Sequence, residues 1–214
     1  MTKRLRALTI DLLLAAVLAI VAAPARAESP GATQQEWALL PQWCAWTQQA
    51  PQYGANSLSR AKPSSGINMY EEYVRRYGDG WTAMHHYCWA LVDIMRLGKL
   101  AGRNQPVHDH AAERALGNLD YVLQNSAIGF AFRPDVLGSR ARLLIRMNDY
   151  GKAAQTAQIL ISESPALPDG YVLLADILVK AGRTNDAKAV VAKGDELVTD
   201  KERYAKMRGT IKIK

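Results

Sequence analysis

Histidines and cysteines that could bind a metal ion gather in the first half of the sequence. His85, His86 and Cys88 lie close together in the stretch WTAMHHYCWALVDIM, and His108 and His110 follow further along the chain. Imidazole nitrogens and cysteine thiolates are the ligands of tetrahedral zinc sites. A metal site built on His85, His108 and His110, with His86 beside them, is therefore one interpretation of this part of the chain.

The spacing of these histidines argues instead for a structural role. On a helix, His85 and His86 point about a quarter-turn apart, so one ion does not easily bind both. His108 and His110 lie at an expected boundary between a loop and a helix, where Asp109 fits the role of a helix cap. We favour packed or hydrogen-bonded histidines and expect no metal and no cofactor, with a metal-binding protein as the alternative.

Motifs of the common enzyme classes are missing from the sequence. It contains no GxSxG elbow, no HExxH pair and no Gly-rich phosphate loop. Cys88 and His85 lie one helical turn apart, so their side chains run parallel, and no third group orients them. We therefore predict that the protein is not an enzyme. An enzyme that uses the histidine cluster is the alternative.

The first residues have the pattern of a secretory signal. A basic start, Met1 to Arg6, precedes an apolar stretch from Leu12 to Ala23, and Ala25-Arg26-Ala27 offers the small residues that signal peptidase accepts. The apolar stretch is shorter than the roughly twenty residues that cross a bilayer. We predict a signal peptide at residues 1–27 that is cleaved after Ala27, a periplasmic location, and no membrane insertion after cleavage.

The two cysteines of such an exported chain, Cys44 and Cys88, are expected to form a disulfide because the compartment is oxidising. The bond would tie an irregular segment around Cys44 to the helix that carries Cys88. In the chain-entropy model, closing the loop between Cys44 and Cys88 stabilises the folded chain by about 3–4 kcal/mol. Free thiols and metal ligation are the alternatives.

Charged residues give no sign of a nucleic-acid partner. The formal net charge is +7, but Lys and Arg are spread along the chain and no strand-borne aromatic motif accompanies them. We expect a protein or peptide partner and no nucleic acid. The oligomeric state is not predicted.

The chain divides into two kinds of sequence. All five Trp, both Cys and all four His precede position 111, and the part after about Pro134 is rich in Ala, Leu, Ile and Val. Residues 28–80 form a Trp-rich segment in which prolines limit any helix to short pieces. Its tryptophans could stack on sugar rings, but Trp at this density more often fills a core.

Apolar residues at three- and four-residue steps predict helices from Trp81 to about Leu97 and from Ala111 to Leu123. These two helices form a pair within residues 81–133. Because no period of two appears anywhere in the sequence, the predicted fold class is all-α.

An offset of 34 residues aligns the second half of the chain with itself. It pairs Pro134 with Pro168, Asp135 with Asp169, Ala141 with Ala175, Leu144 with Leu178 and Ala153 with Ala187. This period is typical of helix-turn-helix arrays, in which neighbouring units stack into an α-solenoid. We predict repeats at residues 134–167 and 168–199 and a charged cap or tail at residues 200–214.

These units resemble the tetratricopeptide repeat family. The matching residues are Leu137, Ala141, Leu144, the turn Asn148-Asp149-Tyr150, Ala153 and Pro165 in the first unit, and Tyr171, Leu174, Ala175, Leu178, the turn Gly182-Arg183, Ala187 and Val191 in the second. Three residues depart from the family pattern. Arg140 stands at a position that is normally apolar, Gly194 replaces the usual small helix former, and Thr199 stands where a proline would close the unit. The pair in residues 81–133 could be a degenerate first repeat. The block around Cys44 and Cys88 also resembles exported proteins of this family in Gram-negative bacteria.

The resemblance implies an interaction adaptor whose groove is lined mainly by the first helix of each pair. The groove candidates are Arg142, Ile145, Arg146, Leu173 and Asp176. Arg142 and Arg146, one turn apart, would favour an acidic or carboxylate-ended ligand. An ordinary solvated face is the alternative for these residues. In an exported chain, such an adaptor would assist the assembly or function of an envelope complex.

Overall fold

A computed structural model of the chain describes residues 32–48, 68–100 and 105–212. The regular elements in these ranges are helices, and no strand occurs among them. None of the described helices has the length and apolar character that crossing a membrane requires. The predicted signal peptide, residues 1–27, lies outside the described residues, so its cleavage after Ala27 stays a prediction.

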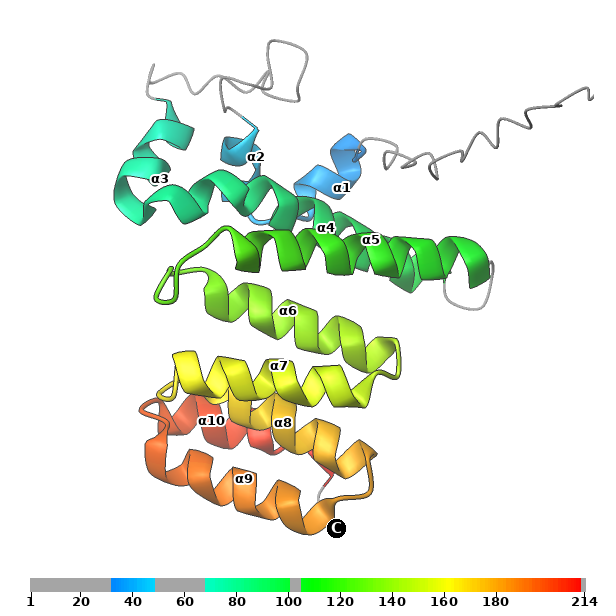
Figure 1. Ribbon diagram of the computed structural model, residues 1–214, viewed down its shortest axis with the longest axis vertical. Coiled ribbons are helices and arrows are strands. Elements are labelled where there is room, and N and C mark those ends of the chain that lie inside the picture. The colour runs from blue at the N-terminus through cyan, green and yellow to red at the C-terminus, as the bar shows by residue number, and fades with distance from the viewer. Residues whose placement is uncertain (1–31, 49–67, 101–104, 213–214) are drawn as a thin grey trace, which may run out of the picture. The chain divides into compact units, whose positions relative to one another are not determined.

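From α4 onward the helices are arranged as stacked pairs (Figure 1). The pairs are α4 (Met84–Leu100) with α5 (Gln105–Gln124), α6 (Arg133–Arg146) with α7 (Tyr150–Glu163), and α8 (Pro168–Lys180) with α9 (Thr184–Leu197). Helix α10 (Lys201–Arg208) packs on α8 and α9. The shorter elements that precede the pairs are α1 (Gln34–Ala38), α2 (Trp43–Thr47), α3 (Met69–Tyr77) and the 3-10 helix η2 (Asp79–Ala83). The predicted all-α fold, a short α-solenoid of repeats like tetratricopeptide repeats, is confirmed.

The turn between α6 and α7 recurs between α8 and α9 with the period of the sequence. Asn148 and Gly182, which are 34 positions apart, both have a positive φ, 59° and 75°. The next N–H group reaches back to the last turn of the preceding helix in both repeats: from Asp149 to the Leu144 carbonyl (3.0 Å) and from Arg183 to the Leu178 carbonyl (2.8 Å). A left-handed residue in this place ends a helix and satisfies its last carbonyls. The two repeats therefore share the backbone geometry of this turn.

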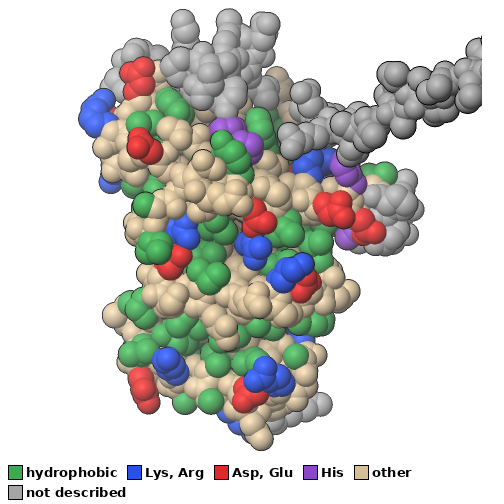
Figure 2. Space-filling view, in the orientation of Figure 1, with side chains coloured by type: hydrophobic (Ala, Val, Ile, Leu, Met, Phe, Trp, Pro, Cys, Tyr) green, Lys and Arg blue, Asp and Glu red, His purple; other side chains and the backbone are tan. Residues whose placement is uncertain are grey.

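Small residues are buried in the core that the paired helices share. The alanines that the 34-residue offset aligns are completely buried, as is one further alanine of α7; they are Ala141, Ala153, Ala157, Ala175 and Ala187. Leucines and isoleucines of α6, α7 and α8 and valines of α9 pack around them in one core cluster. On the outside, acidic and basic side chains are interspersed with apolar ones over the face that Figure 2 shows.

The helix predicted from Trp81 to about Leu97 is divided in the structure. Its first residues belong to η2, and α4 begins at Met84. The tighter turn brings Gly80 against the ring of Phe130, where an added Cβ would lie 2.9 Å from a ring carbon. Trp81 is completely buried in the same cluster. This boundary therefore depends on packing against a residue far along the chain.

Helix α5 starts earlier than predicted, at Gln105 rather than near Ala111. Pro106 lies in its first turn, where proline is tolerated because the missing N–H would have no partner there. Residues 108–110 are therefore helical, and Asp109 lies inside α5 instead of capping it.

Arg140 departs from the repeat pattern because it takes part in a polar layer between helices. Its guanidinium pairs with Asp120 of α5 at 2.6 Å and donates to the Thr156 hydroxyl of α7. Leu174 and Val190 stand at the corresponding positions of the next repeat. A satisfied polar pair thus replaces an apolar pair at this level of the stack.

Thr199 and Gly194 also have structural reasons for departing from the pattern. The Thr199 N–H donates to the Ala166 carbonyl at 3.2 Å, which a proline could not do. Gly194 leaves room for Tyr204 of α10, whose hydroxyl donates to the Val191 carbonyl at 2.8 Å. Both departures therefore serve the attachment of the last helices.

Two connections hold the N-terminal segment on the first helix pair. The predicted disulfide between Cys44 of α2 and Cys88 of α4 is confirmed, with 5.7 Å between the Cα atoms. Beside it, Trp43 lies among Trp81, Tyr87 and other rings of the aromatic core, with centroids 5.7 Å and 6.0 Å away. Short helices that bury little surface of their own gain stability from such a covalent tether.

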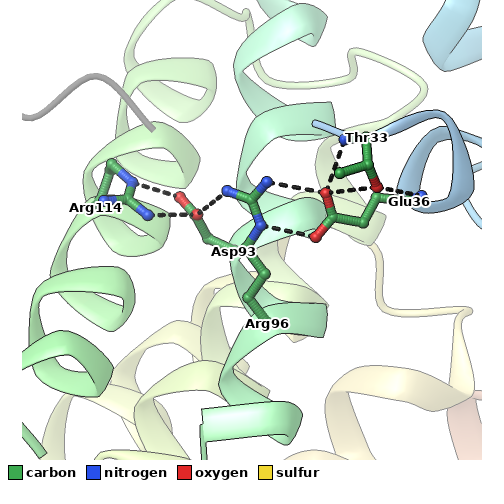
Figure 3. Close-up of polar contacts among 5 residues, drawn as sticks. All are labelled: Thr33, Glu36, Asp93, Arg96 and Arg114. Atoms are coloured by element: carbon green, nitrogen blue, oxygen red, sulfur yellow. Dashed lines mark hydrogen bonds and ion pairs between the residues drawn. The ribbon is translucent and has the colours of Figure 1, made fainter. Parts of the chain in front are cut away.

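The second connection is a chain of ion pairs between α1, α4 and α5 (Figure 3). Arg96 donates to both carboxylate oxygens of Glu36 at 2.8 Å and 2.9 Å. Glu36 also accepts from the Thr33 N–H at 2.9 Å, which completes a capping box at the start of α1. On the other side of Arg96, Asp93 is almost completely buried and is held by Arg114 of α5 at 2.6 Å and 2.8 Å.

Replacing Gly194 by alanine should destabilise the protein. The new Cβ would lie 2.2 Å from the Tyr204 hydroxyl oxygen, so we expect Gly194→Ala to lower the free energy of unfolding by about 1–3 kcal/mol. Gly117→Ala is the control, because a Cβ at Gly117 in α5 meets nothing within 4 Å; it should stabilise by up to about 1 kcal/mol. Urea denaturation measures both, and equal behaviour of the two variants would contradict this account of Gly194.

Acid should weaken the attachment of α1. The Arg96 hydrogen bonds lower the pKa of Glu36 from 4.5 to about 2, so the folded carboxylate binds fewer protons than the unfolded one between these values. Its stabilisation is complete above pH 4.5 and is lost as the pH falls towards 2. Glu36→Gln should cost at most about 3 kcal/mol at neutral pH and flatten the loss of stability below pH 4.5. Glu72→Gln is the control, because it removes only a surface ion pair with Arg75. Its free energy of unfolding should depend on pH as in the wild type.

Candidate functional site

The first helices of the pairs lie next to one another along one side of the stack. Helix α6 contacts α8, and α10 contacts α8 in turn. Helix α4 joins this series through Tyr87, whose hydroxyl lies 3.0 Å from the Ser139 hydroxyl and donates to the Asp135 carbonyl at 3.2 Å. We call this surface, formed by α4, α6, α8 and α10, the first-helix face. It brings together side chains from four helices that are distant in the sequence.

A ladder of charged groups crosses the first-helix face. Arg142 of α6 donates to Asp169 of α8 at 3.3 Å, and Arg203 of α10 donates to the other carboxylate oxygen at 2.7 Å. The side chains of Arg142 and Arg203 are 53% and 52% exposed. Each guanidinium has five N–H donors, so both keep donors that are not used by Asp169. The ladder therefore holds two arginines in place while leaving them accessible.

Charged residues near the start of the helices of this face recur with the period of the repeat. Asp135, Asp169 and Arg203 are separated by 34 positions each and lie in the first turns of α6, α8 and α10. Helix α10 thus stands in the place of a further first helix, with arginine where the other two have aspartate. The pKa of Asp135 is raised above its ordinary value by burial and by the neighbouring Asp169, and Arg142 and Arg203 limit this rise. The charges of the first-helix face act on one another across the repeats.

The groove residues predicted from the sequence fall into two groups. Arg142 and Arg146 are exposed, and Arg146 donates to the Ile94 carbonyl of α4 at 3.4 Å. Asp176 is partly exposed and pairs with Lys180 on the same helix. By contrast, Ile145 and Leu173 pack with the core cluster of α6 to α9. Contact of these residues with a partner stays a prediction.

Sequence reasoning missed the groups that tie the first-helix face together. Tyr87, Ser139, Asp169 and Arg203 were not among the candidates. For Arg203 a signal was present, because applying the 34-residue offset once more to Asp169 leads to it. The pairing of Tyr87 with Ser139 had no such signal, because Tyr87 lies in α4, before the first unit of the 34-residue repeat.

The histidines are held by hydrogen bonds and by ring contacts. His85 Nδ1 lies 2.9 Å from the Thr82 carbonyl, and His86 Nδ1 lies 2.7 Å from the Asn118 amide oxygen. The two rings are 4.3 Å apart. Burial and the neighbouring His86 lower the pKa of His85 to about 4. Both imidazoles thus have definite structural partners, His85 in η2 and His86 in α5.

His108 and His110 lie elsewhere on α5. Asp109 is 3.4 Å from His108, and His108 precedes Asn118 by ten positions, about 15 Å along a helix. Within the described ranges, no three His, Cys, Asp or Glu residues are placed to hold a metal ion together. Cys88 is bonded to Cys44 and cannot act as a thiolate ligand or nucleophile. The structure therefore does not bring His85 together with His108 and His110.

Residues 144–211 match the tetratricopeptide repeat family. The matched part extends from the end of α6 through α10, and so includes both the second predicted repeat and the helix that carries Arg203. Searches of curated proteins and of solved structures each found no significant match. The matched part agrees with the resemblance seen in the sequence and points to interactions between proteins.

Mild acid should destabilise the protein through His85. The folded histidine, with a pKa of about 4 against an ordinary 6.5, binds fewer protons than the unfolded one between these values. Stability is complete above pH 6.5 and falls as the pH drops towards 4, by at most about 3 kcal/mol. His85→Gln should flatten this part of the profile, measured by urea unfolding at several pH values. His110→Gln, at an exposed position, should leave it as in the wild type; an unchanged slope in His85→Gln would contradict the assignment.

Proposed function

We propose that the protein is a periplasmic adaptor that binds a peptide or protein partner along the first-helix face and assists the assembly or function of an envelope complex. The observation that carries the proposal is the ladder in which exposed Arg142 and Arg203 share Asp169 across three helices. The family match of residues 144–211 supports it, because tetratricopeptide repeats generally serve as interaction scaffolds.

The ladder is suited to binding an extended peptide. Asp169 restrains both guanidiniums before a partner arrives, so less side-chain entropy is lost on binding. Their remaining N–H groups can donate to carboxylates or to backbone carbonyls of the partner, and bonds from a charged donor are the stronger kind. Asp135 and Asp169 offset the charge of the two arginines, so the face suits acidic and amide groups without requiring a highly acidic partner.

The proposed location depends on the N-terminal sequence and on the cysteines. Residues 1–27 have the features of a secretory signal. The Cys44–Cys88 disulfide supports an oxidising compartment, because such bonds are rare in the cytosol of most cells. Cell fractionation and N-terminal sequencing test the location: the mature protein should start at Glu28 and be recovered with the periplasm.

Site-specific photo-crosslinking in cells tests the binding surface. A photoreactive residue at Ser139 or Asp176, on the first-helix face, should form a crosslink to a defined protein that mass spectrometry identifies. The same residue at Gln155 or Gln158, which are exposed on α7, should not. Combining the Ser139 probe with Arg142→Ala and Arg203→Ala should remove the crosslink. Crosslinks of equal yield from both sets of positions, or crosslinks insensitive to the arginine changes, would refute the proposed surface.

A further inference from the structure

A cluster of aromatic rings lies on the surface where α4 and α5 meet, and the first-helix face does not account for it. His85, His86 and Trp89 come from α4, and Tyr121 comes from α5. The ring of His86 lies 3.9 Å from that of Tyr121 and 5.2 Å from that of Trp89. Trp89 is 37% exposed and Tyr121 is 43% exposed. We call Trp89, His86 and Tyr121 the aromatic platform.

The exposure of these rings contrasts with the other aromatic residues nearby. Trp81 is completely buried, and Trp43 packs into the aromatic core beneath the N-terminal segment. The α4–α5 pair does not depend on these exposed rings, because both helices contribute residues such as Ala90 and Leu119 to one buried core cluster, and Arg114 of α5 binds Asp93 of α4. Exposed Trp and Tyr side chains that gather in one place are characteristic of binding surfaces.

The polar atoms of the platform are neutral hydrogen-bonding groups. His86 Nδ1 faces the Asn118 amide oxygen, which is an acceptor, so Nδ1 carries the hydrogen and Nε2 has the lone pair. Burial lowers the pKa of His86, which keeps the ring uncharged at neutral pH. The Tyr121 hydroxyl can donate or accept. The platform thus combines ring faces with uncharged donors and acceptors, and its three side chains carry no formal charge.

We propose that the aromatic platform binds a pyranose ring of an uncharged glycan chain. The C–H face of a pyranose is flat and apolar and fits against Trp89 or Tyr121, and its hydroxyls can donate to His86 Nε2 and exchange hydrogen bonds with the Tyr121 hydroxyl. An ionic ligand would find no counter-charge in these rings. This site is separate from the first-helix face and does not depend on the proposed adaptor function.

Saturation-transfer NMR with the purified protein and two neutral oligosaccharides, maltoheptaose and chitotetraose, tests the site. At millimolar sugar concentration we expect transfer to the sugar C–H protons of at least one of them. Trp89→Ala and Tyr121→Ala should each weaken binding by about tenfold or more, whereas Tyr121→Phe, which keeps the ring, should have a smaller effect. Arg142→Ala on the first-helix face is the control and should bind like the wild type. Circular dichroism shows whether each variant is folded.

Three results would overturn the proposal. The wild-type protein could give no transfer to either sugar, or sugar binding could persist unchanged in folded Trp89→Ala and Tyr121→Ala variants. Sedimentation could also show a concentration-dependent dimer that Trp89→Ala abolishes, which would make a second copy of the chain the occupant of the platform. Each of these results leaves the crosslinking test of the first-helix face unaffected, so the two proposals fail separately.

Discussion

The close approach of paired helices at buried alanines is the constraint on which the described structure depends. Ala141 of α6 and Ala153 of α7 are completely buried in one core cluster, and Ala175 of α8 and Ala187 of α9 occupy the corresponding places one repeat later. A larger side chain there would push the helices apart and disturb a close-packed core. The left-handed residues Asn148 and Gly182 set the turn that lets the helices face each other. Because both features recur with one period, successive first helices present their side chains on a common face.

The N-terminal segment is attached by a different principle. Helices α1 and α2 are too short to form a core of their own. A covalent bond at Cys44 and a bidentate ion pair at Glu36 join them instead to α4, at points on different turns of that helix. In this way they cover the side of the first pair that has no preceding repeat. Repeat arrays need their terminal units covered in this way to remain soluble.

The periodic part of the structure could be predicted from the sequence, because each repeat carries its own turn and its own small residues. The offset that pairs Leu144 with Leu178 also locates the turn, and the cysteine count together with the export signal predicted the disulfide. Contacts between unlike positions could not be predicted. Glu36 and Arg96 are separated by 60 positions and no pattern links them. Arg140 departs from the repeat pattern, and nothing in the sequence indicates that Asp120 and Thr156 lie beside it.

Helix α10 connects the stability of the solenoid with the chemistry of its first-helix face. Tyr204 covers the end of the core at Gly194, and Arg203, the residue before it, completes the ladder at Asp169. In repeat proteins each unit is stabilised mainly by its neighbours, so the last unit has the least support. Here the helix that supplies this support also supplies one of the two exposed guanidiniums. The packing of Tyr204 therefore also fixes the position of Arg203. A partner bound at Arg203 would in turn stabilise the packing of α10 against α8 and α9.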